Sequence, residues 1–292
     1  AEFGLVHRFE RSGVLTGLMR ARCFTQNDSH IYCAKTDLKK ELLDVLALFR
    51  EVYDDVFSIQ DYWFRLSLPD FENTEKFGDI ENKTMWDEAT ESARAALQEF
   101  GAKYVEGGGE AAFYGPKIDV QIRNVGGKED TIATVQIDFY SASRFDLAFI
   151  NSDGQKEKPV IIHRAIMGSF ERFFAFLIEQ YAGAFPAWLA PTQVAILPVS
   201  EKHVDYAKEI ENVLRAGGLQ VVLNNSNETL GKKVREAKSS QLPYFIVIGD
   251  QEAQAKTITV ESRDEGKLSA MSVDLFLKKI REEIVTRKGK IK

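Results

Sequence analysis

The order of the predicted secondary structure changes at one proline-bounded stretch, and this change restricts the possible folds more than any other feature. Strands and helices follow no regular alternation before Pro186-Ala-Trp-Leu-Ala-Pro191, whereas they alternate after it. Alternation over about a hundred residues is typical of a small α/β layer domain. The 292 residues of the chain are enough for two domains of roughly 150 residues. We therefore expect one domain over residues 1–190 and a second over 191–292.

Side-chain spacing predicts the elements of both domains. In the first, it predicts helices over 36–57, 84–100 and 169–181 and strands over 117–123, 131–139 and 158–163. In the second, it predicts strands over 194–199, 219–223, 245–248 and 257–260 and helices over 203–215, 230–239 and 273–287. We expect Thr36 and Asp37 to cap the first helix, and Thr84 and Asp87 to form a capping box on the second.

Composition excludes several classes of protein. Hydrophobic residues make up 44% and charged residues 28% of the chain, as in an ordinary globular protein. The only cysteines, Cys23 and Cys33, exclude a disulfide framework and favour a reducing compartment, which points to the cytoplasm. The densest apolar stretch, around 173–178, is far shorter than the roughly 20 residues of a membrane-spanning helix. The chain starts at Ala1, and no secretory leader is visible. Because the first residue is not Met, we expect the chain to be incomplete.

The segment from 20 to 31 carries an unusual set of functional groups on one strand face. Because alternate side chains of a strand point to the same side, this face is expected to gather Arg20, Arg22, Phe24, Gln26, Asp28 and His30. The alternative is a solvated strand face, but solvated faces rarely combine an aromatic ring, a carboxylate and an imidazole. The face spans roughly 20 Å from Phe24 to His30, which is enough for two ligands placed end to end.

A second alternating segment precedes it. Glu2, Gly4, Val6, Arg8 and Glu10 share a face, and the loop Arg11-Ser12-Gly13 lets this strand fold back antiparallel to the next. Arg8 then lies on the same sheet face as the side chains from Arg20 to His30. A guanidinium suits a pair of phosphate oxygens, although a single surface Arg is more often a solvated charge.

These segments resemble the second signature motif of threonyl-tRNA synthetases, a class II family: EFGLVHRFE from Glu2 to Glu10 and GLMRARCFTQNDSH from Gly17 to His30. The family's remaining catalytic segments are similar to Gly115-Pro-Lys117, Val135-Gln136-Ile-Asp138-Phe139 and Ile162-His163-Arg-Ala-Ile-Met-Gly168-Ser169-Phe-Glu-Arg172. The resemblance covers nearly the whole chain. It implies an antiparallel-sheet class II catalytic core, α+β and truncated at its N-terminus, followed by an α/β anticodon-binding domain.

The resemblance implies an amino-acid end of the site. In this family two His and one Cys hold a Zn²⁺ ion that binds the amino and hydroxyl groups of threonine, and His30 and His163 fall on the two His positions. Gln26, Asp28 and Tyr114 fall on positions that hold threonine. Without the family, either His would more often be a core or hydrogen-bonded residue. A site built for a hydroxyl rejects valine strongly and serine weakly.

The resemblance also implies a second end of the site, which binds ATP. The threonine carboxylate attacks the α-phosphate of ATP, which Mg²⁺ accompanies, and the acyl group then passes to tRNA(Thr). Arg8, Lys117 and Arg172 fall on the catalytic positions. The expected ATP-binding residues are Arg8, Glu10, Arg20, Phe24, Gln136, Ser169 and Arg172. Gly168 and Ser169 are expected to let the backbone approach the ligand.

The second domain resembles the family's anticodon-binding domain. The net charge of the chain is −6, which argues against coating nucleic acid by bulk charge, although residues after 190 are mildly basic. The residues expected at the anticodon are Asn227, Glu228, Arg235 and Arg263. The chain carries Ser226, Thr229 and Glu261 where many relatives carry basic residues, and a carboxylate such as Glu261 repels RNA.

The resemblance begins inside the second motif, so the first motif, much of the dimer interface, the third zinc ligand and any editing domain would lie outside this chain. We expect a fragment of a threonine–tRNA ligase that is a homodimer at full length. Cys33 points away from His30 by strand parity and is expected to be structural. The loop 107–109 lacks a phosphate-binding pattern. Two alternatives remain: a non-catalytic relative that binds an amino acid, a nucleotide or RNA, and a class II synthetase for proline, glycine or serine.

Overall fold

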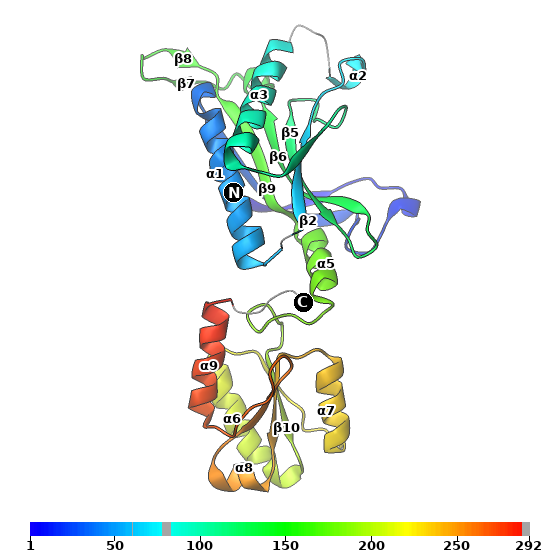
Figure 1. Cartoon of the computed structure of the whole chain (residues 1–292), viewed down its shortest axis with the longest axis vertical. Coiled ribbons are helices and arrows are strands. Elements are labelled where there is room, and N and C mark those ends of the chain that lie inside the picture. Colours follow the sequence, from blue (N-terminus) through cyan, green and yellow to red (C-terminus); the bar gives the residue numbers. More distant parts are fainter. Residues whose placement is uncertain (60, 78–82, 288–292) are drawn as a thin grey trace. The chain divides into compact units, whose positions relative to one another are not determined.

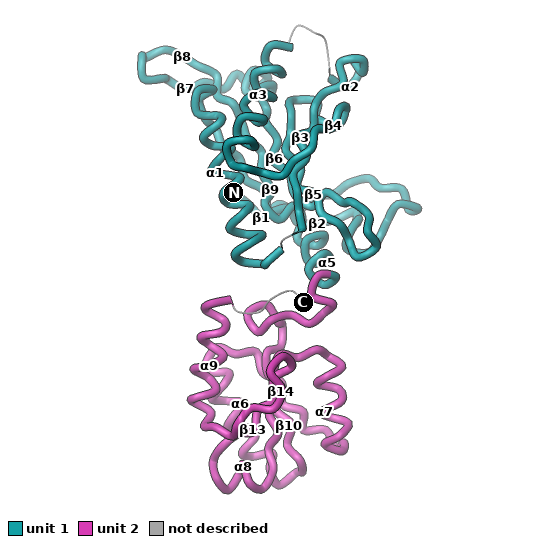
Figure 2. The backbone as a smooth tube through the Cα atoms, viewed as in Figure 1, with its two compact units in different colours: residues 1–179 teal, residues 180–292 magenta. Residues whose placement is uncertain are grey.

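The computed structural model describes residues 1–59, 61–77 and 83–287. Contacts divide the chain into two units, residues 1–179 and 180–292 (Figure 2). The division falls inside the helix α5 (Phe170–Tyr181), ahead of the predicted domain boundary at Pro191. In the part of the chain that the structure describes, no helix combines the length and the apolar character needed to cross a membrane.

Unit 1 is built on a seven-stranded sheet (Figure 1). Its strand order is β1-β2-β9-β6-β5-β3-β4, and all neighbours are antiparallel except β3 and β4. The strands are β1 (Glu2–His7), β2 (Cys23–Cys33), β3 (Tyr62–Ser67), β4 (Tyr104–Gly107), β5 (Lys117–Arg123), β6 (Glu129–Asp138) and β9 (Val160–Ser169). A separate small hairpin pairs β7 (Phe149–Ile150) with β8 (Lys156–Glu157).

Two long helices, α1 (Leu38–Arg50) and α3 (Lys83–Phe100), lie side by side over one face of this sheet (Figure 1). The short helices α2 (Thr74–Phe77) and α4 (Ser141–Arg144) lie in the connections. Ile118, Val120 and Ile122 of β5 are fully buried. Because side chains alternate along a strand, Lys117 and Asp119 lie on the opposite face. The helices thus leave one sheet face for functional groups.

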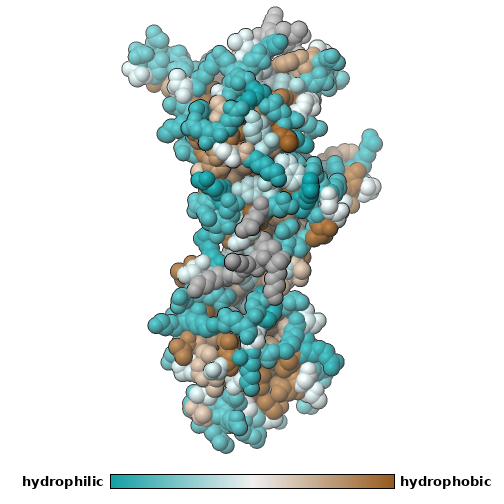
Figure 3. Space-filling view, viewed as in Figure 1, coloured by the Kyte–Doolittle hydropathy of each residue, from teal (hydrophilic) through white to brown (hydrophobic). Residues whose placement is uncertain are grey.

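Unit 2 is a three-layer α/β fold. Its five-stranded sheet has the order β11-β10-β12-β13-β14, with β10 parallel to β11 and β12. The helices α6 and α9 pack on one sheet face and α7 packs on the other (Figure 1). Its elements are β10 (Val194–Pro198), α6 (Val204–Ala216), β11 (Val221–Leu223), α7 (Leu230–Ser239), β12 (Tyr244–Ile248), α8 (Asp250–Ala255), β13 (Thr259–Ser262), β14 (Gly266–Lys267) and α9 (Val273–Val285). The face of the molecule shown in Figure 3 is mostly hydrophilic, with small hydrophobic patches.

The predicted elements are confirmed in type, and the differences lie at their ends. A 3-10 turn (Lys35–Asp37) leads into α1, so Asp37 has near-helical dihedral angles and its side chain makes no capping hydrogen bond. Thr84 lies inside α3, which begins at Lys83, and therefore is not its cap. The strand predicted over 158–163 starts at Val160 and continues to Ser169. Asp37 thus occupies the N-cap position of α1 without a capping hydrogen bond, and the prediction that Thr84 caps α3 is wrong, whereas the helices themselves are confirmed.

Gly168 allows β9 to approach β6 closely. Its φ angle is +61°, and a Cβ atom added there would lie 1.9 Å from the carbonyl oxygen of Ile132. The family resemblance predicts instead that this glycine makes room for a ligand. Although Gly168 also lines a cavity, the contact with the Ile132 backbone is sufficient reason for a glycine.

We predict that Gly168→Ala is far more destabilising than Gly154→Ala. Gly154 has a φ angle of +77° with nothing within 4 Å of an added Cβ, so its substitution costs only backbone strain, about 1–2 kcal/mol. Gly168→Ala adds a steric clash with backbone and should cost on the order of 3 kcal/mol or more. Denaturant unfolding of both variants measures the difference. Equal losses of unfolding free energy would contradict this view of Gly168.

Candidate active site

Two adjoining cavities lie on the sheet face that carries Lys117 and Asp119. The first has a volume of about 230 Å³ and is rich in cationic side chains: Arg8, Arg20, Lys117 and Arg172. The second has a volume of about 270 Å³ and is lined by Asp28, His30, Tyr114 and His163, among others. Gln26 and Gln136 belong to both linings. The sheet face predicted from strand alternation therefore carries both cavities. We call the first cavity the basic end and the second the imidazole end.

The imidazole end depends on the pairing of β2 with β9. His30 and His163 are direct cross-strand partners in this antiparallel pair. Their ring centroids are 4.8 Å apart and their planes are nearly perpendicular. A single ion could therefore contact both rings, which a shared metal requires.

Asp138 fixes the orientation of His163. Its Oδ2 atom lies 2.9 Å from His163 Nε2, and its Oδ1 atom accepts the backbone N–H groups of Tyr140 and Ser141. Burial raises the pKa of Asp138, but the hydrogen bonds from His163, Ser141 and Tyr140 outweigh it, and the pKa is lowered overall. An ionised carboxylate only accepts hydrogen bonds, so Nε2 of His163 carries the proton in this contact. Nδ1 of His163 is then the ring nitrogen that a metal could bind.

The polar groups around the two rings form a small hydrogen-bonded set. Gln26 Nε2 donates to Asp28 Oδ1 at 3.3 Å, and the Tyr114 hydroxyl donates to Gln136 Oε1. Burial raises the pKa of Asp28, and Glu2 adds to this effect against the opposing influence of His30. Burial also raises the pKa of Tyr114 to about 12, with the carboxylates of Asp138 and Asp28 contributing. This end thus combines donors and acceptors of the kind that a small polar ligand needs.

Each cation of the basic end is held by its own partner. The Arg8 guanidinium lies 4.9 Å from the centroid of the Phe24 ring, and Arg20 pairs with Glu10 at 3.0 Å. Arg172 donates to the carbonyl oxygens of Met19 and Thr131, at 3.0 and 2.9 Å. Burial lowers the pKa of Arg172. Ser169 Oγ accepts the backbone N–H of Arg172 at 3.3 Å, as a helix cap does.

Comparisons with known proteins agree with this geometry. Residues 1–181 match the tRNA synthetase class II core domain (G, H, P, S and T), and residues 193–283 match an anticodon-binding domain. The RNA-binding domain of threonyl-tRNA synthetase from Cryptosporidium parvum Iowa II has a similar solved structure, with a TM-score of 0.84 and 34% sequence identity over 96% of this chain and 68% of that chain. This chain belongs to the threonyl-tRNA synthetase family.

Curated relatives of this synthetase chain are about twice as long. Threonine–tRNA ligase from Oceanobacillus iheyensis is 45% identical over 99% of this chain but only 45% of its own length. The corresponding enzyme from Bacillus velezensis is 46% identical over 96% of this chain and 43% of its own length. The chain therefore spans less than half of the relatives that it matches.

Arg22 is the one residue of the predicted strand face that lines neither cavity. Its guanidinium donates to the Glu10 carbonyl oxygen at 3.0 Å and to Ser12 Oγ at 3.1 Å. β2 begins only at Cys23, so strand alternation does not apply to Arg22. The prediction for this residue was wrong. The sequence patterns also assign no role to Asp138 or Asp119, although Asp138 occurs within a segment of the family resemblance and Asp119 lies two residues after the end of another.

The metal-ligand set of this synthetase chain is incomplete. Within residues 1–59, 61–77 and 83–287, no group of three or more His, Cys, Asp or Glu side chains could hold a metal ion. The two imidazoles fit zinc in donor type, and the Asp138 contact to His163 is of the kind found behind zinc-bound histidines. Three protein ligands are usual for catalytic zinc, and the two imidazoles are one fewer than that number.

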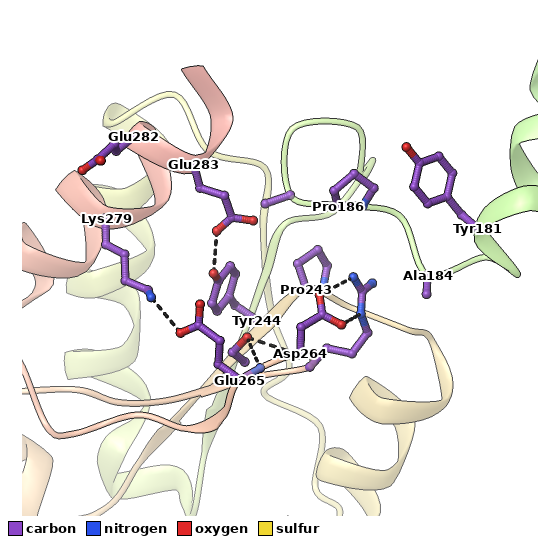
Figure 4. A pocket seen from close by; sticks show the side chains of 13 residues that line it. Tyr181, Ala184, Pro186, Pro243, Tyr244, Asp264, Glu265, Lys279, Glu282 and Glu283 are labelled. Atoms are coloured by element: carbon purple, nitrogen blue, oxygen red, sulfur yellow. Dashed lines mark hydrogen bonds and ion pairs between the residues drawn. The ribbon is translucent and has the colours of Figure 1, made fainter. Parts of the chain in front are cut away.

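The predicted anticodon residues of unit 2 fall into two groups. Asn227 and Glu228 lie just before Thr229, the N-cap of α7, and this helix carries the exposed Arg235. Arg263 lies elsewhere, in a cavity of about 510 Å³ that also contains Tyr181, Pro186 and Tyr244 (Figure 4). The Arg263 guanidinium pairs with Asp264 and donates to the carbonyl oxygens of Phe185 and Gln241. Its donors are thus already used within unit 2.

We predict that Cys33 resists alkylation at neutral pH whereas the exposed Cys23 reacts. Burial raises the pKa of Cys33 to about 11, with Glu41 and Asp37 contributing. Only about one thousandth of this thiol is then ionised at pH 8, and the thiolate is the reactive form. Mass spectrometry after iodoacetamide treatment should show Cys33 modification rising about tenfold per pH unit from 8 to 10. Equal modification of both cysteines at pH 8 would contradict this.

Proposed function

We propose that the protein activates threonine with ATP and transfers it to tRNA(Thr), as a threonine–tRNA ligase. The observation that carries this proposal is the pairing of His30 with His163 in a cavity that adjoins a basic cavity. The imidazole end suits an amino acid with a hydroxyl group, and the basic end suits a triphosphate. Gln136 lines both cavities, so two bound ligands would meet beside it.

At the imidazole end, His30 and His163 would hold a Zn²⁺ ion, with a third ligand from outside this chain. When bound, the ion would attach the amino and hydroxyl groups of threonine. Asp28 accepts a hydrogen bond from the substrate, since burial disfavours its ionised form and an N–H donor would compensate for this. Gln26 and Tyr114 orient the substrate from the same wall. Valine lacks the hydroxyl that these groups require, and serine retains it.

At the basic end, Arg172 binds the outer phosphates, and Arg8 and Lys117 stabilise the charge that develops on the α-phosphate. The threonine carboxylate oxygen forms a bond to this phosphorus while the bond to pyrophosphate breaks, and the leaving group takes the electron pair. Arg20 also binds the outer phosphates, and Mg²⁺ accompanies the nucleotide. These roles are electrostatic and positional, and such contributions dominate phosphoryl transfer. In the second step a tRNA ribose hydroxyl attacks the acyl carbonyl and AMP leaves.

The adenine end involves Phe24 and Glu10. Phe24 is already stacked on one side by Arg8, so a base would approach its other face or displace the guanidinium. Glu10 is held by Arg20, which fixes the carboxylate for a hydrogen bond to the base. Gln136 and Ser169 line the first cavity and place polar groups along the nucleotide.

We propose that residues 191–292 bind the tRNA anticodon through Asn227, Glu228 and Arg235. Glu261 carries a negative charge that would repel RNA, but Lys238 Nζ lies 2.6 Å from its carboxylate and offsets this charge. Arg263 is committed to contacts within unit 2 and is left out of this surface. A cytoplasmic homodimer at full length rests on the family resemblance.

We predict that the full-length protein catalyses ATP–pyrophosphate exchange that depends on threonine. Serine should support weak exchange and valine should support none above background, because valine leaves the polar groups of the pocket unpaired. Radioactive pyrophosphate incorporated into ATP measures the rate with each amino acid. Exchange with proline or glycine would instead indicate another class II specificity. Binding of threonine or ATP without exchange would favour the non-catalytic relative.

We predict that the full-length protein binds about one zinc ion per chain and that His30→Ala and His163→Ala lower this content severalfold. Each substitution removes one of the paired imidazoles. His7→Ala is the matched control, because His7 is exposed on β1 and lines neither cavity. Elemental analysis of the purified variants measures the metal without relying on activity. Zinc content unchanged by both His30→Ala and His163→Ala would place the metal elsewhere.

A further inference from the structure

A buried carboxylate lies directly behind Lys117. Asp119 is two residues further along β5 and has 1% of its side chain exposed. Both of its oxygens accept from Lys117 Nζ, at 3.1 and 2.9 Å. Three further donors from the neighbouring strands complete its set: Arg65 Nη2 at 3.0 Å, Ser67 Oγ at 2.8 Å and Thr134 Oγ1 at 3.1 Å. Asp119 is therefore tied to β3, β5 and β6 together.

The contact leaves Lys117 able to bind a ligand. A lysine ammonium group has three N–H donors, and Asp119 engages the group from one side. Lys117 keeps 19% of its side chain exposed and lines the basic cavity with Arg8 and Arg172. A free lysine side chain samples many rotamers, whereas one anchored to a rigid carboxylate is held in place before the substrate arrives.

We propose that Asp119 is a positioning residue for the adenylation reaction, which holds the Lys117 ammonium group at the wall of the nucleotide cavity. This inference rests on the proposed function. Asp119 belongs to the lining of the same cavity, but only 1% of its side chain is exposed, so we propose that it acts through Lys117. Arg65, Ser67 and Thr134 also donate to the Asp119 carboxylate, so no single one of these three donors fixes its position.

A carboxylate in a phosphate-binding cavity has two opposing effects. Its negative charge weakens binding of the ATP ground state, whereas the fixed ammonium group stabilises charge that appears only in the transition state. Loss of the carboxylate should therefore lower kcat with little increase in KM for ATP. Damage to the fold alone would instead raise KM and lower the unfolding midpoint together.

The test uses threonine-dependent ATP–pyrophosphate exchange by the full-length protein. Asp119→Asn keeps the size of the side chain and removes its charge. We expect kcat to fall about 10- to 100-fold, while KM for ATP changes less than about threefold. In a Lys117→Ala background the same substitution should change kcat less than about threefold, because the group that Asp119 positions is gone.

Ser67→Ala is the matched control. Ser67 is fully buried and donates to the same carboxylate but lines neither cavity. It should lower the unfolding midpoint and change kcat less than about threefold. The inference is overturned if Asp119→Asn leaves kcat unchanged, lowers it equally in the Lys117→Ala background, or loses rate only in proportion to its unfolding midpoint, as Ser67→Ala would. Absence of threonine-dependent exchange in the unsubstituted protein would instead refute the proposed function itself.

Discussion

The register between β2 and β9 is the constraint on which the site depends. It places His30 opposite His163 and Asp28 opposite Ala165. A slip of one residue would turn every functional side chain of β2 to the other face, and a slip of two would separate the imidazoles by a further 6–7 Å or so. The approach of two imidazoles from distant segments of the chain is therefore a consequence of strand pairing.

Contacts outside the two strands hold this register. The backbone N–H of Thr25 donates to both oxygens of Glu171 at 3.0 and 2.9 Å, which ties the start of β2 to α5. The buried Tyr53 hydroxyl donates to the Ile166 carbonyl oxygen at 3.0 Å, which ties β9 to the helical layer. A bulge between Gln26 and Asp28 shifts the register of the β2–β9 pairing at that point. The helical layer, far from the cavities, thus helps to set the position of the ligand-binding side chains.

Much of this site could be predicted because strand alternation is a strict rule. Alternation alone groups Phe24, Gln26, Asp28 and His30, and all four side chains line the two cavities. It fails for Arg22, because the boundary of β2 cannot be read from alternation. Alternation also cannot show which strands are neighbours. The approach of His163 to His30 follows only from the family resemblance, since 133 positions separate them in the sequence.

Two buried carboxylates, Asp119 and Asp138, have contacts that local sequence patterns do not predict. Lys117 and Gln136 are cross-strand partners on β5 and β6, and each is followed two residues later by a buried aspartate, Asp119 and Asp138. Because alternate side chains of a strand point to the same side, each aspartate lies on the same face as the residue two positions before it. In sequence such an aspartate resembles any polar strand residue. Its meaning depends on burial and on donors from other strands, which offset the desolvation of an ionised carboxylate in the interior. One aspartate orients an imidazole and the other holds an ammonium group, so both ends of the site follow the same arrangement: a group that faces the ligand, backed by a buried anion that never needs to touch it.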